Sequence, residues 1–248
     1  MASWVSHLIV ADGVMKEIPE LDRRGFCVGC IAPDCNIENE DWSGFTPSRE
    51  VTHWMTEGDK SPRDAERFYR GYMLLHPAKS HEEQSFQWGY YVHLLTDAGF
   101  KLLVYDEERV AKSWERIDKI PELKEKAKGV ERTYPGVKQL ISNEERMTDI
   151  YQVEREYLDA HPDSGYLTDI LPLEDFPDYL SYLPKGAIVR KLKVMGYMPS
   201  MRKARYPFLA VTKEEWLTYL EGTTKWAIRA IKEKMAALEE DKAALDGR

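Results

Sequence analysis

The pattern of apolar positions predicts helices near both ends of the chain and in its middle. Across residues 4–15 apolar side chains recur every three or four positions, and Ser3 precedes them as an N-cap. The strongest apolar stretch of helical period runs over residues 81–100. The last predicted helix begins at Thr212, with Glu215 three residues later in the spacing of a capping box.

The segments between these helices have less regular patterns. Residues 25–47 are rich in glycine, cysteine, proline, asparagine and aspartate and show no period, so they predict a long loop. Residues 172–200 predict short helices and turns. Alternating strand patterns are scarce, so the fold class is all-α. Further helices are predicted over residues 48–57, 62–76, 106–118 and 143–160, the last of them charged and exposed.

Composition places the chain among globular proteins. Of 248 residues, 43% are hydrophobic and 11% aromatic, which is enough to bury a sizeable core. No stretch approaches the roughly 20 apolar residues of a membrane-spanning helix, so we expect no membrane insertion. The N-terminal residues lack a basic leader and a cleavage site, and three clustered cysteines are too few for a disulfide framework. We therefore expect a cytoplasmic protein.

Net charge bears on the partners. A formal charge of −8 speaks against nucleic-acid binding, which needs a basic surface. Residues 185–205 are an exception, with seven basic side chains and no acidic one. They form either a solvated face or a basic lip that attracts a small anionic substrate.

The most informative segment for chemistry is Gly89-Tyr-Tyr-Val-His93-Leu-Leu-Thr-Asp97. Positions four apart share a helix face, so an imidazole and a carboxylate here can bind one metal ion. Gly89, one turn earlier, leaves room for that ion. A buried histidine bonded to the aspartate of its own helix gives the same pattern without a metal.

Two further residues favour the metal. Asp34 follows a proline in an apolar run, where an unpartnered carboxylate is costly to bury. His53 lies early in a predicted helix among apolar neighbours, one turn after Arg49. Two nitrogens and two carboxylates make a plausible set for zinc or a similar divalent ion.

The runs Trp4-Val-Ser-His7, Ile31-Ala-Pro-Asp34, Thr52-His53-Trp54 and Gly89 to Asp97 resemble the zinc-dependent phospholipase C family, which is related in fold to the S1/P1-type nucleases. The resemblance covers residues 4–97. It implies a multi-helix bundle of that type, with Asp34, His53, His93 and Asp97 as ligands of one zinc ion. It also implies that His7 and Asp97 touch a second ion.

The chain departs from the three-zinc members of that family, because it has no histidine between His93 and His161. One ion, or two with His7, fits better. The resemblance then divides a single domain, residues 1–248, into three parts. These are a metal-binding core over residues 1–118, an insertion over residues 120–210 that is either a substrate lid or an interaction surface, and the C-terminal helix over residues 212–246.

The resemblance implies a hydrolase that attacks a phosphoester with metal-activated water. Asp34 or Asp97 would orient that water, and Arg49 would hold an anionic group of the substrate. Hydrolysis of another bond, oxygen chemistry with iron, or a non-catalytic scaffold that binds a ligand or partner remain alternatives. Cys27, Cys30 and Cys35 are reduced and buried, or form a structural metal site, or carry out redox chemistry.

Overall fold

The computed structural model describes residues 2–41, 43–56 and 60–246 and is mostly helical, which confirms the all-α fold class. The first half contains α1 (Trp4–Glu17), α2 (Arg23–Gly29), the 3-10 helix η1 (Ala32–Asp34), β1 (Ile37–Glu38), β2 (Phe45–Thr46), α3 (Arg49–Thr52), α4 (Pro62–Phe68), the π-helix η2 (Tyr69–Met73) and α5 (His81–Tyr105). The second half contains α6 (Glu107–Asp118), α7 (Pro121–Lys126), α8 (Tyr134–Leu140), α9 (Asn143–Ala160), the π-helix η3 (Tyr166–Ile170), α10 (Ala187–Met195) and α11 (Lys213–Asp246).

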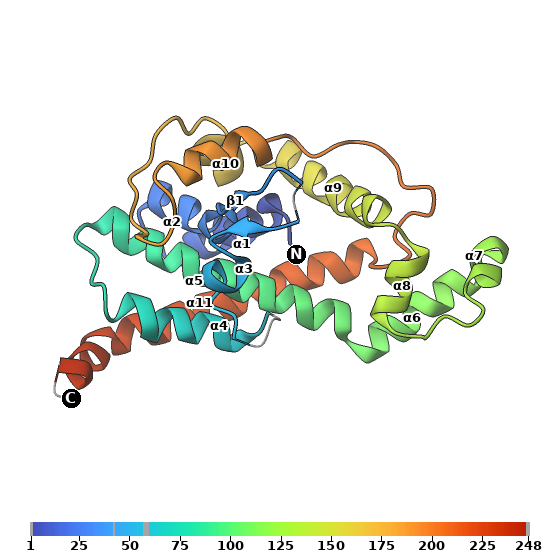
Figure 1. The fold of residues 1–248 in the computed structure, drawn as a ribbon, viewed down its shortest axis with the longest axis horizontal. Coiled ribbons are helices and arrows are strands. Elements are labelled where there is room, and N and C mark those ends of the chain that lie inside the picture. Colours follow the sequence, from blue (N-terminus) through green and yellow to red (C-terminus); the bar gives the residue numbers. More distant parts are fainter. Residues whose placement is uncertain (1, 42, 57–59, 247–248) are drawn as a thin grey trace.

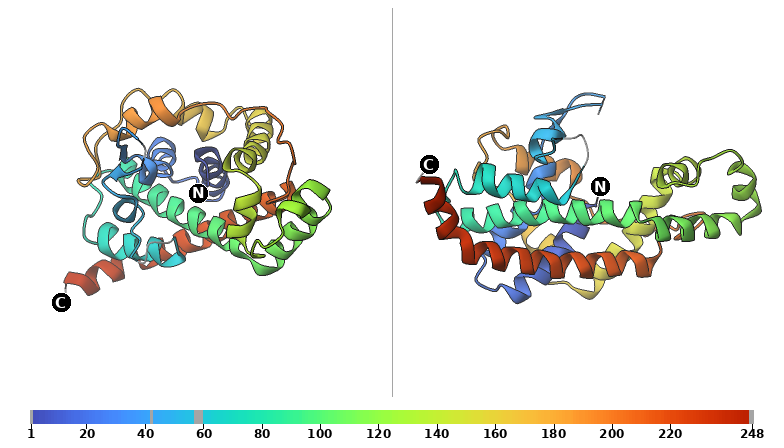
Figure 2. Two further views of the ribbon diagram at one scale, coloured as in Figure 1. Left: turned by 45° about the vertical axis from the view of Figure 1, so that its right-hand side comes forward. Right: turned by 90° about the horizontal axis from the view of Figure 1, so that it is seen from below.

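The two longest helices, α5 and α11, form the axis of the molecule and run side by side (Figures 1 and 2). Helix α1 packs against α11, and α2 packs against α5. Helices α9 and α10 lie above them in the view of Figure 1. Over the described part of the chain, no helix is sufficiently long and apolar for a bilayer crossing.

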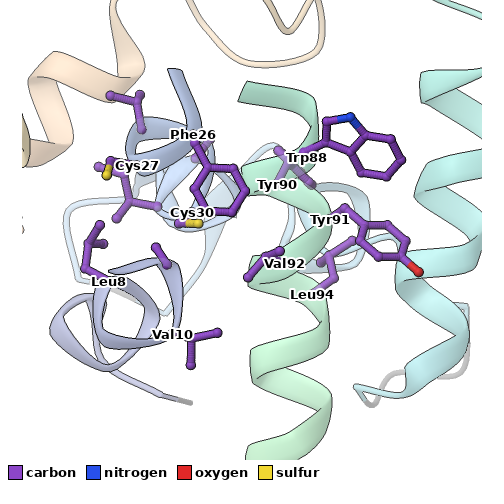
Figure 3. Close-up of a cluster of buried hydrophobic side chains, with 14 of the residues drawn as sticks. Leu8, Val10, Phe26, Cys27, Cys30, Trp88, Tyr90, Tyr91, Val92 and Leu94 are labelled. Atoms are coloured by element: carbon purple, nitrogen blue, oxygen red, sulfur yellow. The ribbon is translucent and has the colours of Figure 1, made fainter. Parts of the chain in front are cut away.

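Buried side chains form two clusters. The larger one fills the space between α1, α2, α4 and α5, where Leu8, Phe26 and Tyr90 are fully buried (Figure 3). The smaller one surrounds Trp114 of α6 and Val137 of α8. Residues 120–210 are divided between the two clusters, because α7 and α8 join the smaller one while α9 and α10 pack on the larger one.

Three glycines bring α2 and α5 into backbone contact. A Cβ atom on Gly25 would lie 2.3 Å from the Glu82 carbonyl oxygen, and one on Gly29 would lie 2.1 Å from the Phe86 oxygen. A Cβ atom on Gly89 would lie 2.1 Å from the Phe26 oxygen. No side chain fits at such distances, so glycine at these positions sets the separation of the two helices.

This contact corrects the expectation for Gly89. Glycine at this position serves the packing of α2 on α5 rather than leaving space for an ion beside His93. The close approach nevertheless shapes the site one turn later. It brings the carbonyl oxygen of Cys30, just beyond α2, to 2.7 Å from Nδ1 of His93.

Several segments differ from the sequence prediction. The predicted loop over residues 25–47 contains α2, η1 and a two-stranded hairpin, although Trp42 lies outside the described residues. Helix α2 begins because the Asp22 side chain accepts a hydrogen bond from the Gly25 amide at 2.7 Å. The helix predicted over residues 48–57 ends at Thr52, because Trp54 has a left-handed backbone (φ 55°); its last predicted residue, Glu57, is not among the described ones.

The helix starts read from the sequence are confirmed. The Ser3 side chain accepts from the Ser6 amide, and Thr212 and Glu215 form the reciprocal bonds of a capping box at 3.1 and 2.8 Å. Helix α9 matches its predicted range but is only partly exposed, since Ile150 and Glu154 are buried.

We expect Gly89→Ala to destabilise the protein by about 3 kcal/mol, because the new methyl group must push α2 away from α5. Gly222→Ala is the matched control. Gly222 is exposed on α11 with nothing within 4 Å of an added Cβ, so alanine should raise stability by about 1 kcal/mol. Urea unfolding of both variants measures the difference; equal effects would contradict the close contact.

Candidate metal centre

Five of the six residues selected from the sequence converge in the interior. His7 comes from α1, Asp34 ends η1, His53 follows α3, and His93 and Asp97 lie one turn apart on α5. Four of these side chains are at most 1% exposed, and that of Asp34 is 11% exposed. The sixth residue, Arg49, lies on the surface.

Backbone carbonyl groups fix the orientation of two imidazoles. His93 donates from Nδ1 to the Cys30 oxygen at 2.7 Å, while Nδ1 of His53 lies 3.2 Å from the Arg49 oxygen and 3.0 Å from the Thr52 hydroxyl. Because a carbonyl oxygen only accepts, Nδ1 of His93 carries the proton and its Nε2 keeps the lone pair. The hydroxyl of Tyr90 donates to the Thr52 carbonyl and so ties α3 to α5 beside His53.

The distances between the remaining acceptor atoms match a zinc site. Nε2 of His53 lies 3.3 Å from Asp34 Oδ1 and 3.4 Å from Asp97 Oδ2. Nε2 of His93 lies 3.4 Å from that same oxygen of Asp97 and 3.4 Å from Nε2 of His53. A tetrahedron with zinc–ligand bonds of about 2.05 Å has edges of about 3.3 Å. Four of the six distances among these atoms therefore have the required length. Asp34 and Asp97 belong to different groups of possible ligands, Asp34 with His53 and His93, and Asp97 with His7 and His93.

The protonation states suit a cation. Burial lowers the pKa of His93 well below its usual value and lowers that of His53 as well. Burial opposes ionisation of Asp34, but its interaction with His53 and the nearby charge of Lys60 hold its pKa well below the ordinary value. Neutral imidazoles beside an ionised carboxylate are the forms in which these groups bind metal.

His7 faces the other oxygen of Asp97. Its ring stacks on that of His93, with the centroids 3.9 Å apart, and its Nε2 lies 3.9 Å from Asp97 Oδ1. Burial lowers the pKa of His7 to about 3, so the ring is neutral. Both of its nitrogens and Asp97 Oδ1 are buried without a hydrogen-bond partner among the described residues. This arrangement suits a second ion that shares Asp97 with the first.

Lys60 is a member of the site that the sequence did not indicate. Its ammonium group contacts Asp97 Oδ2, and its charge contributes to the lowered pKa of His53. The residue precedes the N-cap of α4, and nothing in the local sequence distinguishes it from an ordinary surface lysine. The structure thus provides one cation of its own at the edge of the acceptor cluster.

Arg49 lies at the mouth of a cavity that leads to Asp34. The cavity has a volume of about 390 Å³ and is lined by both residues, by the start of α1 and by α9. The guanidinium group of Arg49 lies over the Phe45 ring, 4.3 Å from its centroid, which restrains the exposed side chain. It is therefore placed to meet an anion that enters toward Asp34.

A fully buried carboxyl group, that of Glu154, lies on the same cavity and was also missed. Its Oε1 accepts from the Ser3 and Ser6 hydroxyls, while Oε2 has no partner among the described residues. Burial raises the pKa of Glu154 to about 7. A signal was present in the sequence, because Glu154 shares the apolar face of α9 with Ile150, Val153 and Leu158 at helical spacing.

The cysteines are buried thiols without disulfide bonds. Burial raises the pKa of Cys27, Cys30 and Cys35 well above the usual value, which suppresses the thiolate needed for redox chemistry. Among the described residues, the groups able to hold a metal contain only histidine and aspartate. The structure therefore favours the reading of reduced, buried cysteines.

The basic run over residues 185–205 is largely paired with acidic groups. Arg190 and Lys191 both bind Glu38, at 2.8 and 2.7 Å. Farther along, Arg205 lies 2.9 Å from Glu122. These pairs favour a structural role for the run over that of a lip beside the metal centre.

Searches against family models, curated proteins and solved structures found no match for this chain. The chemistry of the centre therefore rests on its geometry.

Glu154 gives the fold a specific pH dependence. Its pKa is about 7 in the folded chain and 4.5 ordinarily, so the folded state binds the extra proton between these values. The contribution of Glu154 to stability therefore falls as pH rises from 4.5 to 7. We expect Glu154→Gln to remove this slope and to raise stability at pH 8 by on the order of 2 kcal/mol.

Thermal unfolding between pH 5 and pH 8 measures this effect. Glu144→Gln, at an exposed position of the same helix, is the control and should follow the wild type. A wild-type slope that persists in Glu154→Gln would show that groups other than Glu154 cause it and would contradict the raised pKa of Glu154.

Proposed function

We propose that this protein is a zinc-dependent hydrolase that acts on a phosphoester of a small anionic substrate. The observation that carries the proposal is the grouping of Asp34, His53 and His93, whose ligand atoms all lie within 4.8 Å of one another, with Asp97 Oδ2 3.4 Å from both imidazoles. Two nitrogens and two carboxylate oxygens are ligands that zinc accepts readily.

Electrostatics supports a bound cation over a network of hydrogen bonds. Nε2 of His93 carries no proton and lies 3.4 Å from Oδ2 of Asp97, which cannot donate to it. Buried acceptors without donors are costly to desolvate. Lys60 contacts the same oxygen of Asp97. A divalent ion beside His93 would satisfy the imidazole nitrogen and the neighbouring carboxylates.

A divalent ion bound there supplies a Lewis acid and lowers the pKa of water to about 7. The chain supplies the rest of the chemistry. Asp34 is the ligand nearest to solvent and faces the cavity, where its second oxygen can accept a proton from an entering water. Arg49 at the mouth binds an anionic oxygen of the substrate, and Lys60 adds positive charge beside Asp97. Asp97, which lies beside His7, His53 and His93, would be a ligand common to the first ion and to a second one.

Positive groups on both sides of the centre support a phosphoester as the substrate class. The proposal extends to the fold, as a bundle of the zinc-dependent phospholipase C and S1/P1 nuclease type. The convergence of the residues that carry the resemblance, from His7 to Asp97, supports this extension. A cytoplasmic location is part of the proposal and is supported by three free, buried thiols, which suit a reducing compartment.

Metal content is the direct test. We expect the wild type, purified without added metal, to retain about one zinc per chain, or about two if His7 takes part. His93→Ala should lose it, because two of the measured edges end on His93 Nε2. His81→Ala, at the exposed start of the same helix, should keep it. Mass spectrometry of the three proteins measures the content.

A wild type that binds no metal, and shows no thermal shift with zinc, manganese or iron, would overturn the hydrolase. The Lys60–Asp97 ion pair would then be the cation partner of a purely structural network. Metal that raises the melting temperature without supporting turnover of any phosphoester would favour the non-catalytic scaffold.

Arg49 tests the substrate class. Arg49→Gln should lower kcat/KM for bis(4-nitrophenyl) phosphate about tenfold while zinc content stays unchanged, because the variant removes a charge-assisted bond and no ligand. Arg63→Gln, on the exposed side of α4, is the charge-matched control. Unchanged kinetics in Arg49→Gln would remove this residue from substrate binding.

A further inference from the structure

A second cavity, of about 270 Å³, reaches the candidate metal centre at Asp97 and Lys60, whereas the cavity lined by Arg49 reaches it at Asp34. Its walls come from α5, α8, α9 and the segment that leads into α11. Asn143 and Met147 of α9 line both this cavity and the one that contains Arg49. The two cavities thus both reach the centre and meet along one helix.

The walls of the second cavity are largely apolar and aromatic. They include Phe100, Val104, Tyr134, Ile150, Phe208 and Trp216. Trp216 is 2% exposed, and its Nε1–H has no hydrogen-bond partner among the described residues. An indole N–H only donates, so this wall offers a buried donor to an acceptor.

Positive charge dominates the polar part of the walls. Lysines 60, 101 and 138 and Arg146 line the cavity, against the acids Asp97 and Asp149. Asp149 accepts from the Phe208 amide at 2.8 Å, so this carboxylate is already engaged with the backbone.

Arg146 and Lys138 are the cations best placed to bind a ligand. Arg146 is half-buried and anchored by bonds to the Ile141 carbonyl and to Asn143 Oδ1, the latter at 3.2 Å. Neither Arg146 nor Lys138 forms an ion pair with a carboxylate of the described residues. A fixed guanidinium and a nearby ammonium on an aromatic wall suit a small oxyanion attached to an apolar body.

We propose that this cavity binds the far end of the substrate, an apolar arm that ends in a second oxyanion, either a carboxylate or a phosphate. The assignment of this end to a substrate rests on the proposed hydrolase, with the reacting phosphoester at Asp97. Binding of the arm itself depends only on the cavity and is testable without turnover.

The test is calorimetric binding of three probes that share one phenylethyl body: 3-phenylpropanoate, 2-phenylethylphosphonate and the neutral 3-phenylpropanamide. We expect the zinc-loaded wild type to bind at least one anion about tenfold more tightly than the amide. The better of the two anions identifies the terminal group. In Lys138→Gln/Arg146→Gln the preference should disappear, whereas Lys128→Gln/Arg155→Gln, with the same charge change at positions outside the cavity, should keep it.

Equal binding of amide and anions in the wild type would overturn the proposal. A preference that survives Lys138→Gln/Arg146→Gln would also overturn it, since the anion then lies elsewhere, for example on the metal. Lys138→Gln alone, at an exposed position, gives a partial loss if the double variant is unstable. Anion binding without phosphoester hydrolysis would leave the cavity assigned and reject only the hydrolase.

Discussion

The backbone contact between α2 and α5 is the constraint on which the centre depends. Gly25, Gly29 and Gly89 allow the two helices to approach until carbonyl oxygens meet α-carbons. At that separation the chain leaving α2 delivers a carbonyl oxygen to His93 and, four residues later, a carboxylate to His53. A wider separation would remove the partner of the His93 ring and leave its orientation free. The glycines thus determine how the side chains of the candidate centre are placed, although their own role is the contact between α2 and α5.

The centre also depends on burial. Burial keeps the histidines neutral, and the neighbouring groups keep the Asp34 carboxylate ionised. The side chains that do this come from α1, η1, α5 and the residue after α3. Helix α9 then forms the wall that separates this interior from solvent on two sides. One cavity is lined by Arg49 and the other by Arg146, so each cavity that reaches the centre has a cationic side chain in its wall. Such an arrangement suits a substrate with negative charge along its length.

The sequence predicted the helical class, most helix starts and the five converging side chains, because caps, periodicity and the spacing of His93 and Asp97 are local signals. It did not predict α2, because its glycines and cysteines interrupt the helical pattern of apolar residues. The glycines are needed for the close contact with α5, which is distant in the sequence. Lys60 was out of reach for the same reason: its position depends on where the loop before α4 meets α5. Glu154 was different, because an acid on the apolar face of α9 is visible in the sequence once the helix phase is known.

The order of these residues along the chain has a consequence for biosynthesis. All five converging side chains precede residue 98, whereas the cavity walls of α9 and the supporting helix α11 follow residue 142. A growing chain therefore presents all five side chains before the helices that enclose them have been made. Helix α11, which packs on both α1 and α5, is the last to emerge. The side chains of the candidate centre are therefore accessible during translation, before α11 packs over α1 and α5.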